Sequence, residues 1–193
     1  MGKITPIAAT IALAVCAAGG AGAVSGELFG EDLVRVCGAR DIIFAVRQAD
    51  SDGHWYANFG YNIINPARTY YHPGGRLCRL NLKTGKVTTL LEDAAGGVRD
   101  PQVHYDGAKV LFSYRKGGQP HYHLYEIHAD GTGLRQLTDG PFDDVEPTYL
   151  PDGNIIFCSS RCNRWVPCYY TQVAILYRCD SGGQGLRAVH VRP

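Results

Sequence analysis

The 193-residue sequence predicts an all-β fold, a partial β-propeller of about three four-stranded antiparallel blades. The first observation behind this prediction is an internal repeat, because residues 99–113 are written again, with nearly the same order of residue types, at 145–159. Pro101 and Pro147 of the repeat lie 46 residues apart, a period typical of propeller blades and unlike most helical repeats. The second is composition: 24 Gly and 12 Tyr with one Met favour short strands joined by tight turns.

Strand patterns recur three times along the chain. A run of aliphatic residues, a phenylalanine and a closing arginine occurs at 41–47, 110–115 and 155–161. The following strand recurs at 77–80, 124–127 and 176–179, and each copy precedes a glycine-containing turn and another alternating strand. Each unit therefore has the strand order of one antiparallel blade. The predicted blades cover about 41–99, 100–145 and 146–193, and the first has no clear opening strand.

Three blades are fewer than the four to eight of a closed propeller. We therefore expect this chain to be a fragment of a larger protein, completed by further blades from a longer chain or an oligomer. The alternative is an open three-blade structure, whose terminal sheets would expose apolar faces.

The N-terminal segment, residues 1–23, has the pattern of a secretory signal peptide. It contains one charged side chain, Lys3, then an apolar run at 7–15 and small residues up to Ala23. The run is shorter than the about 20 residues of a membrane-spanning helix. The pattern predicts cleavage after Ala23 and a periplasmic or extracellular protein without a membrane span.

The cysteine at position 16, the charge balance and residues 24–40 give further expectations. A lipid anchor at Cys16 is an alternative to cleavage, although Val15 is too large for the position before such a cysteine. Without Lys3 the chain has equal numbers of basic and acidic residues and no basic cluster, so no nucleic-acid partner is expected. Residues 24–40 are predicted to be a linker.

The repeat, with its Asp-Pro or Glu-Pro opening and Asp-Gly turn, resembles the exported propellers of the TolB type. Further motifs are FAVRQ at 44–48, HWYANFG at 54–60, GRLC at 75–78, RDPQVHYDG at 99–107, GPFDD at 140–144, and SRC at 160–162 with Cys168 and TQV at 171–173. Together they resemble the middle propeller domain of the hydrazine synthase alpha subunit family.

This resemblance implies a propeller inside a large exported protein, in a family most of whose members have no assigned reaction. Hydrazine synthase itself carries c-type haem, and covalent haem attachment needs a Cys-x-x-Cys-His motif. The sequence has no such motif, so the haem chemistry is not carried over and no cofactor is predicted.

The cysteines are the first candidates for special chemistry. Six remain after signal cleavage, and an even number in an exported chain favours disulfides. The candidates are Cys158, Cys162, Cys168 and Cys179, and a Cys162–Cys168 bond would close a short loop. A zinc site that uses Cys158, Cys162, Cys168 and a histidine is the alternative, although the spacings match no zinc pattern.

The second set of candidates consists of histidines and acids. His121 and His123 lie two apart on a predicted strand, so their side chains share a face and are weak candidates for a metal site. An exposed polar pair at a loop rim is the alternative. Asp143 and Asp144, with Glu146, are candidates for calcium, or one of the two aspartates accepts backbone hydrogen bonds in the turn between blades.

Aromatic side chains define a predicted ligand or partner loop. An insertion near residues 50–75 is rich in aromatics, and propeller loops are common binding sites. The loop residues are His54, Trp55, Tyr56, Phe59 and Tyr61, together with Trp165 of the cysteine loop. The alternative is that these side chains pack as a local core.

The sequence has no motif of a hydrolase, metalloprotease or phosphate-binding loop, so no catalytic or cofactor-binding residue is predicted, and enzymatic activity stays open. The leading hypothesis is an exported propeller module, a scaffold that binds a protein partner or a small ligand through its loops. The alternative is that the chain belongs to an exported redox (haem) or hydrolytic enzyme whose catalytic part lies elsewhere.

Overall fold

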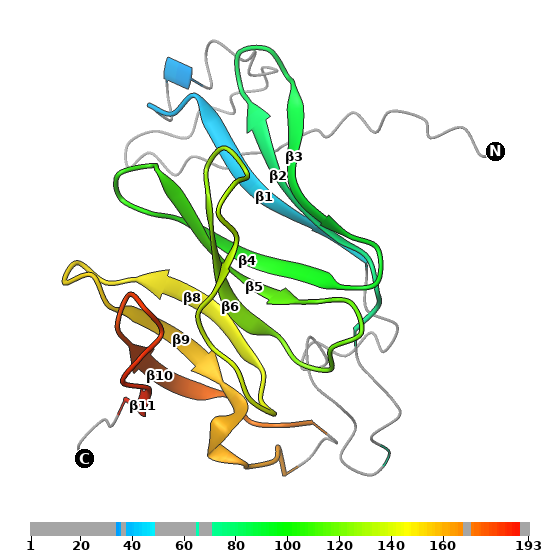
Figure 1. Cartoon of the computed structure of the whole chain (residues 1–193), viewed down its shortest axis with the longest axis vertical. Coiled ribbons are helices and arrows are strands. Elements are labelled where there is room, and N and C mark those ends of the chain that lie inside the picture. The colour runs from blue at the N-terminus through cyan, green and yellow to red at the C-terminus, as the bar shows by residue number, and fades with distance from the viewer. Residues whose placement is uncertain (1–33, 36–37, 49–64, 66–70, 168–170, 190–193) are drawn as a thin grey trace, which may run out of the picture.

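The computed structural model describes residues 34–35, 38–48, 65, 71–167 and 171–189 of the chain. In this part of the chain the strands form three antiparallel sheets, each built from strands that are consecutive in sequence. Figure 1 shows the sheets following one another along the long axis of the molecule in chain order. The predicted all-β, partial propeller architecture is confirmed.

The sheets are named here in chain order. Sheet one contains β1 (Asp41–Arg47), β2 (Gly75–Asn81) and β3 (Val87–Asp93). Sheet two contains β4 (Gly97–Val103), β5 (Lys109–Arg115), β6 (His123–His128) and β7 (Arg135–Gln136). Sheet three contains β8 (Asp144–Tyr149), β9 (Ile155–Ser159), β10 (Ile175–Cys179) and β11 (Arg187–Ala188), with the 3-10 helix η1 (Ser160–Cys162) after β9.

Sheet one has three strands rather than four among the described residues. The recurring phenylalanine pattern lies on β1, β5 and β9, so these strands are equivalent. Sheet one therefore starts with the second strand of a blade, and the described residues contain no counterpart of β4 and β8. This agrees with the expectation that the first unit has no clear opening strand.

The Asp-Pro and Glu-Pro pairs of the repeat form β-bulges in β4 and β8. The pairing register of β4 with β5, and of β8 with β9, shifts at these pairs. Asp100 and Glu146 have left-handed backbones, with φ of 55° and 54°. Pro101 and Pro147 have no N–H to donate to the ladder, and a bulge is one of the few places in a sheet that tolerates this.

Sheet two is the centre of the core because its second strand is apolar on both faces. On β5, Val110 and Phe112 pack toward sheet one and Leu111 packs toward sheet three, and all three are fully buried. The core between sheets one and two also contains Leu77, Val98 and Ile127. The core between sheets two and three also contains Leu124, Leu137, Ile155 and Phe157. Burial of one such side chain contributes about 1.5–3 kcal/mol, so these two cores join the sheets.

Most of the N-terminal region lies outside the described residues. This includes the predicted signal peptide, residues 1–23, and most of the predicted linker, residues 24–40. Within the residues that are described, no helix has the length and apolar character needed to cross a membrane.

Candidate functional site at the loop end

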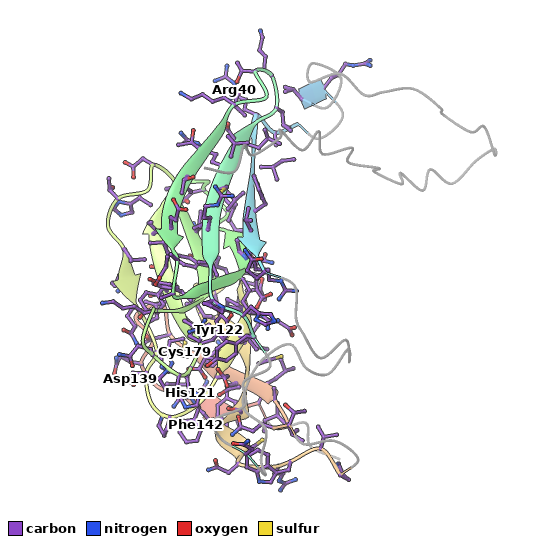
Figure 2. All side chains as sticks on the ribbon, turned by 90° about the vertical axis from the view of Figure 1, so that its right-hand side faces the viewer. Arg40, His121, Tyr122, Asp139, Phe142 and Cys179 are labelled. Carbon is purple, nitrogen blue, oxygen red and sulfur yellow. The ribbon has the colours of Figure 1, made fainter. Side chains whose placement is uncertain are left out.

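Several connections between strands meet at one end of the three sheets, named here the loop end. An antiparallel meander reverses direction at every strand, so alternate connections lie at the same end. A hydrogen bond from the Tyr122 N–H to the Asp143 carboxylate, 2.8 Å long, joins two of them. Figure 2 shows His121, Tyr122 and Phe142 in the lower half of the view, far from Arg40 at the upper end of sheet one. The loop end consists of the described parts of 48–74, 94–96, 116–122, 137–143 and 160–174.

Two consecutive carboxylates, Asp143 and Asp144, lie at the junction of sheets two and three and are fully buried. Asp143 accepts the backbone N–H of Tyr122, which lies in the connection between β5 and β6 rather than in the turn between blades. Asp144 accepts from Ser159 Oγ at 2.6 Å and from two nitrogens of Arg161 at 2.7 and 3.1 Å. Protein donors therefore already occupy oxygens of both acids that a calcium ion would use.

The pKa of Asp144 results from two opposed effects. Burial disfavours the carboxylate, but the contacts with His123, Arg161 and Ser159 outweigh burial and hold the pKa below its ordinary value. Asp144 is therefore a charged group whose partners come from both neighbouring sheets.

The structure brings the predicted histidine pair to the loop end, with each imidazole beside a different carboxylate. His121 Nδ1 lies 3.5 Å from Asp143 Oδ2, and His123 Nδ1 lies 3.7 Å from Asp144 Oδ2. Among the described residues, no three or more His, Cys, Asp or Glu side chains are grouped to hold a metal ion. The pair makes two separate contacts here, and its use as a metal site stays a prediction.

An arginine lies against two tyrosine rings where the connections of sheets one and two meet. The guanidinium carbon of Arg115 is 4.1 Å from the ring centroid of Tyr71 and 5.8 Å from that of Tyr122, and the two rings meet edge to face. The Tyr71 hydroxyl donates to the Pro120 carbonyl at 2.6 Å. Gly97 permits this packing, since a Cβ there would collide with the Tyr122 hydroxyl. Such cation–π contacts position the loop end of sheet two.

Asp93 ties the end of sheet one to sheet two. Its carboxylate accepts the N–H groups of Ala95, Gly96 and Gly117 and the hydroxyl of Tyr114, at 2.7 to 2.9 Å. Burial raises the pKa of this carboxyl, but the hydrogen bonds from Tyr114 and the backbone outweigh it, and the pKa lies below its ordinary value. Asp93 thus organises two connections with one charged group.

The cysteine loop begins with η1. The Ser159 hydroxyl caps η1 by accepting the Arg161 N–H at 3.2 Å, and Asn163 ends it in a left-handed conformation, with φ of 52°. Trp165 then pairs with Gln172 in an isolated bridge and is 45% exposed. The predicted partner residue Trp165 is therefore an exposed aromatic at the loop end.

Among the described residues, the predicted disulfide cysteines Cys158, Cys162 and Cys179 form no bond with one another. Cys158 lies opposite Leu176 in the β9–β10 ladder, three positions from Cys179, so their side chains point to opposite faces and cannot bond to each other. Cys168 lies outside the described residues, and the Cys162–Cys168 disulfide stays a prediction.

The other predicted partner residues lie outside the described residues, within 49–64. They are His54, Trp55, Tyr56, Phe59 and Tyr61. Arg115 and Arg161 were not predicted as loop-end residues, whereas Tyr71 belongs to the aromatic insertion near residues 50–75 that was predicted as a loop. A signal for the two arginines was present, because each closes a copy of the recurring strand pattern.

A hollow of about 420 Å³ lies between β7 and the turn before β11. Of the described residues that line it, Asp139 alone is ionisable; the others are Gln136, Leu137, Thr138, Gly183, Gln184, Gly185 and Leu186. The loop end, which combines charged, aromatic and exposed side chains, is therefore the better candidate site.

Comparison with known proteins supports the resemblance seen in the sequence. No family model matches the chain. The chain is 30% identical over 116 residues to the hydrazine synthase subunit alpha of Kuenenia stuttgartiensis, a match that covers 59% of this chain and 13% of that protein. The chain thus spans a small part of this relative's length.

A solved structure agrees with this match in fold. Hydrazine synthase of Kuenenia stuttgartiensis aligns with a TM-score of 0.55 at 20% identity, over 72% of this chain and 21% of that one. A protein described as a TolB from Agrobacterium tumefaciens aligns with a TM-score of 0.48 at 18% identity, over 59% of this chain and 40% of that one. The predicted resemblance to the hydrazine synthase alpha subunit is confirmed, in sequence over 116 residues and in fold.

Proposed function

We propose that this chain is an exported propeller module, a scaffold that binds a partner protein or a small ligand through its loop end. The observation that carries the proposal is the construction of that end. Buried charges hold the connections in place, while Trp165 stands 45% exposed on the cysteine loop. A rigid support that presents an exposed aromatic is typical of a binding surface.

Hydrogen bonds at the loop end support the proposed scaffold role. Asp144 holds the cysteine loop through Arg161, which also donates to the Asp139 carbonyl at 2.5 Å. Asp93 holds the connections on the other side of sheet two. The connections of the loop end are held on both sides of sheet two and cannot rearrange freely. Binding of a partner would therefore cost little conformational entropy at the site.

Site-specific photo-cross-linking tests this proposal. A benzoylphenylalanine in place of Trp165 is expected to form an adduct of defined mass in cells that export the chain. The matched control replaces Val87, which is 54% exposed but follows the turn at the opposite end of sheet one. The mass of the adduct distinguishes a protein from a small ligand. Equal adducts at both positions, or none at either, would count against the loop end.

Export has its own test. The signal-peptide pattern of residues 1–23 supports a mature chain that begins at Val24. N-terminal sequencing of the periplasmic fraction should find this residue first, and a chain that keeps Met1 in the cytoplasm would contradict export.

A second candidate is favoured by the 30% identity to the hydrazine synthase alpha subunit. In this case the chain is the propeller portion of an exported redox or hydrolytic enzyme whose catalytic part lies elsewhere. Isolation of the native protein with its bound partners, followed by a visible spectrum, tests the haem version. A Soret band that co-purifies with the chain would support it, and a chain that purifies alone and colourless would not.

A further inference from the structure

The face of sheet three that points away from sheet two repeats the apolar pattern that joins the other sheets. Strand pairing makes the third strands equivalent, because Tyr125 lies opposite Phe112 as Tyr177 lies opposite Phe157. The neighbouring apolar positions then form three matching sets. They are Ile43, Leu77 and Leu90 in sheet one, Leu111, Leu124 and Leu137 in sheet two, and Ile156, Leu176 and Val189 in sheet three.

Burial separates the third set from the second. Leu124 is 0% exposed and Leu137 is 6% exposed, because both pack against sheet three. Their counterparts Leu176 and Val189 are 46% and 38% exposed. The backbone is the same at both places, since Leu137 N–H donates to Leu124 O at 2.8 Å and Val189 N–H donates to Leu176 O at 2.9 Å. Sheet three thus has an apolar face built like one that is covered elsewhere in this chain.

An arginine at equivalent positions of sheets one and three also indicates that the outer face of sheet three is uncovered. Arg79 of sheet one donates to the Ala129 carbonyl of sheet two at 3.0 Å. Arg178 occupies the equivalent place in sheet three, opposite Ile156. It contacts Asp152 of its own sheet, but its Nε is buried without a hydrogen-bond partner among the described residues. A buried N–H without an acceptor costs free energy. The outer face of sheet three therefore lacks a polar contact as well as an apolar one.

The chain also contains the complementary surface. In sheet two the side chains that face sheet one are Val110, Phe112, Tyr114 and Ile127, which are 0 to 5% exposed. Sheet one carries the equivalent residues on its own outer face, where they are only half-buried: Ile42, Phe44, Val46 and Leu80.

We infer that the outer face of sheet three binds the outer face of sheet one in a second copy of this chain. Each contact would continue the stacking already made between sheets one and two and between sheets two and three. Two copies related by a twofold axis would form both contacts and close a ring of about six blades, within the four to eight of closed propellers. This inference concerns assembly and does not depend on the loop-end ligand.

Sedimentation velocity of the purified chain over a range of concentrations tests the inference. The wild-type chain should sediment as a dimer. Leu176→Asp places a charge on the contact and should raise the dissociation constant about 30-fold or more. Leu134→Asp is the matched control, because Leu134 is 43% exposed but lies directly before β7 of sheet two, away from the two outer faces. It should leave the dimer intact.

A mixing experiment makes the test specific to this pair of faces. Phe44→Asp on the other face should also give monomers, and circular dichroism checks that both variants are folded. An equimolar mixture of Leu176→Asp and Phe44→Asp should recover dimers, because one of its two contacts then has both faces intact. If Phe44→Asp does not fold, Leu80→Ser replaces it in the mixture. A monomeric wild type, an unaffected Leu176→Asp dimer, or a mixture that stays monomeric would overturn the inference.

Discussion

The carboxylate of Asp100 accepts a hydrogen bond from the backbone N–H of Glu146, at 3.1 Å and across 46 residues of sequence. Both residues open the β-bulges of the repeat. The same oxygen of Asp100 accepts from Arg99 Nε at 2.6 Å, and Arg99 Nη2 lies 3.5 Å from Glu146 Oε1. The bulges of sheets two and three are therefore hydrogen-bonded directly. The two bonded residues are 46 positions apart, which is the period of the sequence repeat.

Asp100→Asn tests the energy of this contact. Asn tolerates the left-handed backbone, but it removes the charge beside Arg99, whose side chain is 5% exposed. We expect the free energy of unfolding at pH 7 to fall by about 1.5–3 kcal/mol in urea titrations. The control is Glu146→Gln at the equivalent bulge, where the side chain is 57% exposed and the expected loss is below about 0.5 kcal/mol. Equal losses of unfolding free energy in the two variants would show that the Asp100 contact between the bulges does not stabilise the fold more than an exposed charge does.

Acid should destabilise the chain through Asp144. Its folded pKa lies below the ordinary value of 3.8, so the unfolded state takes up the proton first as pH falls. The stability it contributes is present above about pH 4 and is lost as pH falls through the folded pKa. In unfolding experiments from pH 6 to pH 2, Asp144→Asn should be less stable at pH 6 and lose less stability than the wild type. An unchanged slope in Asp144→Asn would refute this role.

The stability lost on truncation of a leucine should depend on whether its side chain is buried between two sheets. Leu124 is fully buried between sheets two and three, so Leu124→Ala should lower the free energy of unfolding by about 2–5 kcal/mol. Leu134, directly before β7, is 43% exposed, and Leu134→Ala should lower the free energy of unfolding by less than about 1 kcal/mol. Thermal and urea unfolding of the two variants would measure the difference. A similar cost for both would mean that the core between the sheets is not the main source of stability.

Cysteine labelling should distinguish the buried thiols of Cys158 and Cys179 from cysteines joined in the predicted disulfide. Burial raises the pKa of Cys158 and of Cys179 to about 11, with the Glu146 charge adding to the effect at Cys158. At pH 7 each should contain roughly 100-fold less thiolate than an unperturbed cysteine and react slowly with iodoacetamide until the protein unfolds.

Peptide mapping without reductant completes this experiment. A linked pair of peptides that contain Cys162 and Cys168 would support the predicted disulfide. A Cys158–Cys179 link would contradict the strand register of β9 and β10.

Local patterns accounted for much of the fold. Strands were predicted at 41–47, 110–115 and 155–161 because aliphatic and aromatic runs between glycine turns favour strands wherever they occur. The third ends at Ser159, and its last two predicted residues form the start of η1. The bulges were missed, although a proline inside a strand pattern is a signal for one. The loop-end contacts were less accessible, because Tyr71 meets Arg115 and Tyr122 only after two sheets have packed together.

The sequence by itself determined three sets of strands, their order and a period of 46 residues, because hydrophobic runs and turn residues act over a few neighbours. Only the tertiary structure decided which side chains are buried and which polar groups pair. It buries Asp143 and Asp144, joins Asp100 to Glu146, and leaves Leu176 exposed where Leu124 is covered. These outcomes depend on which sheets lie side by side, because burial and hydrogen-bond partners come from segments distant in sequence.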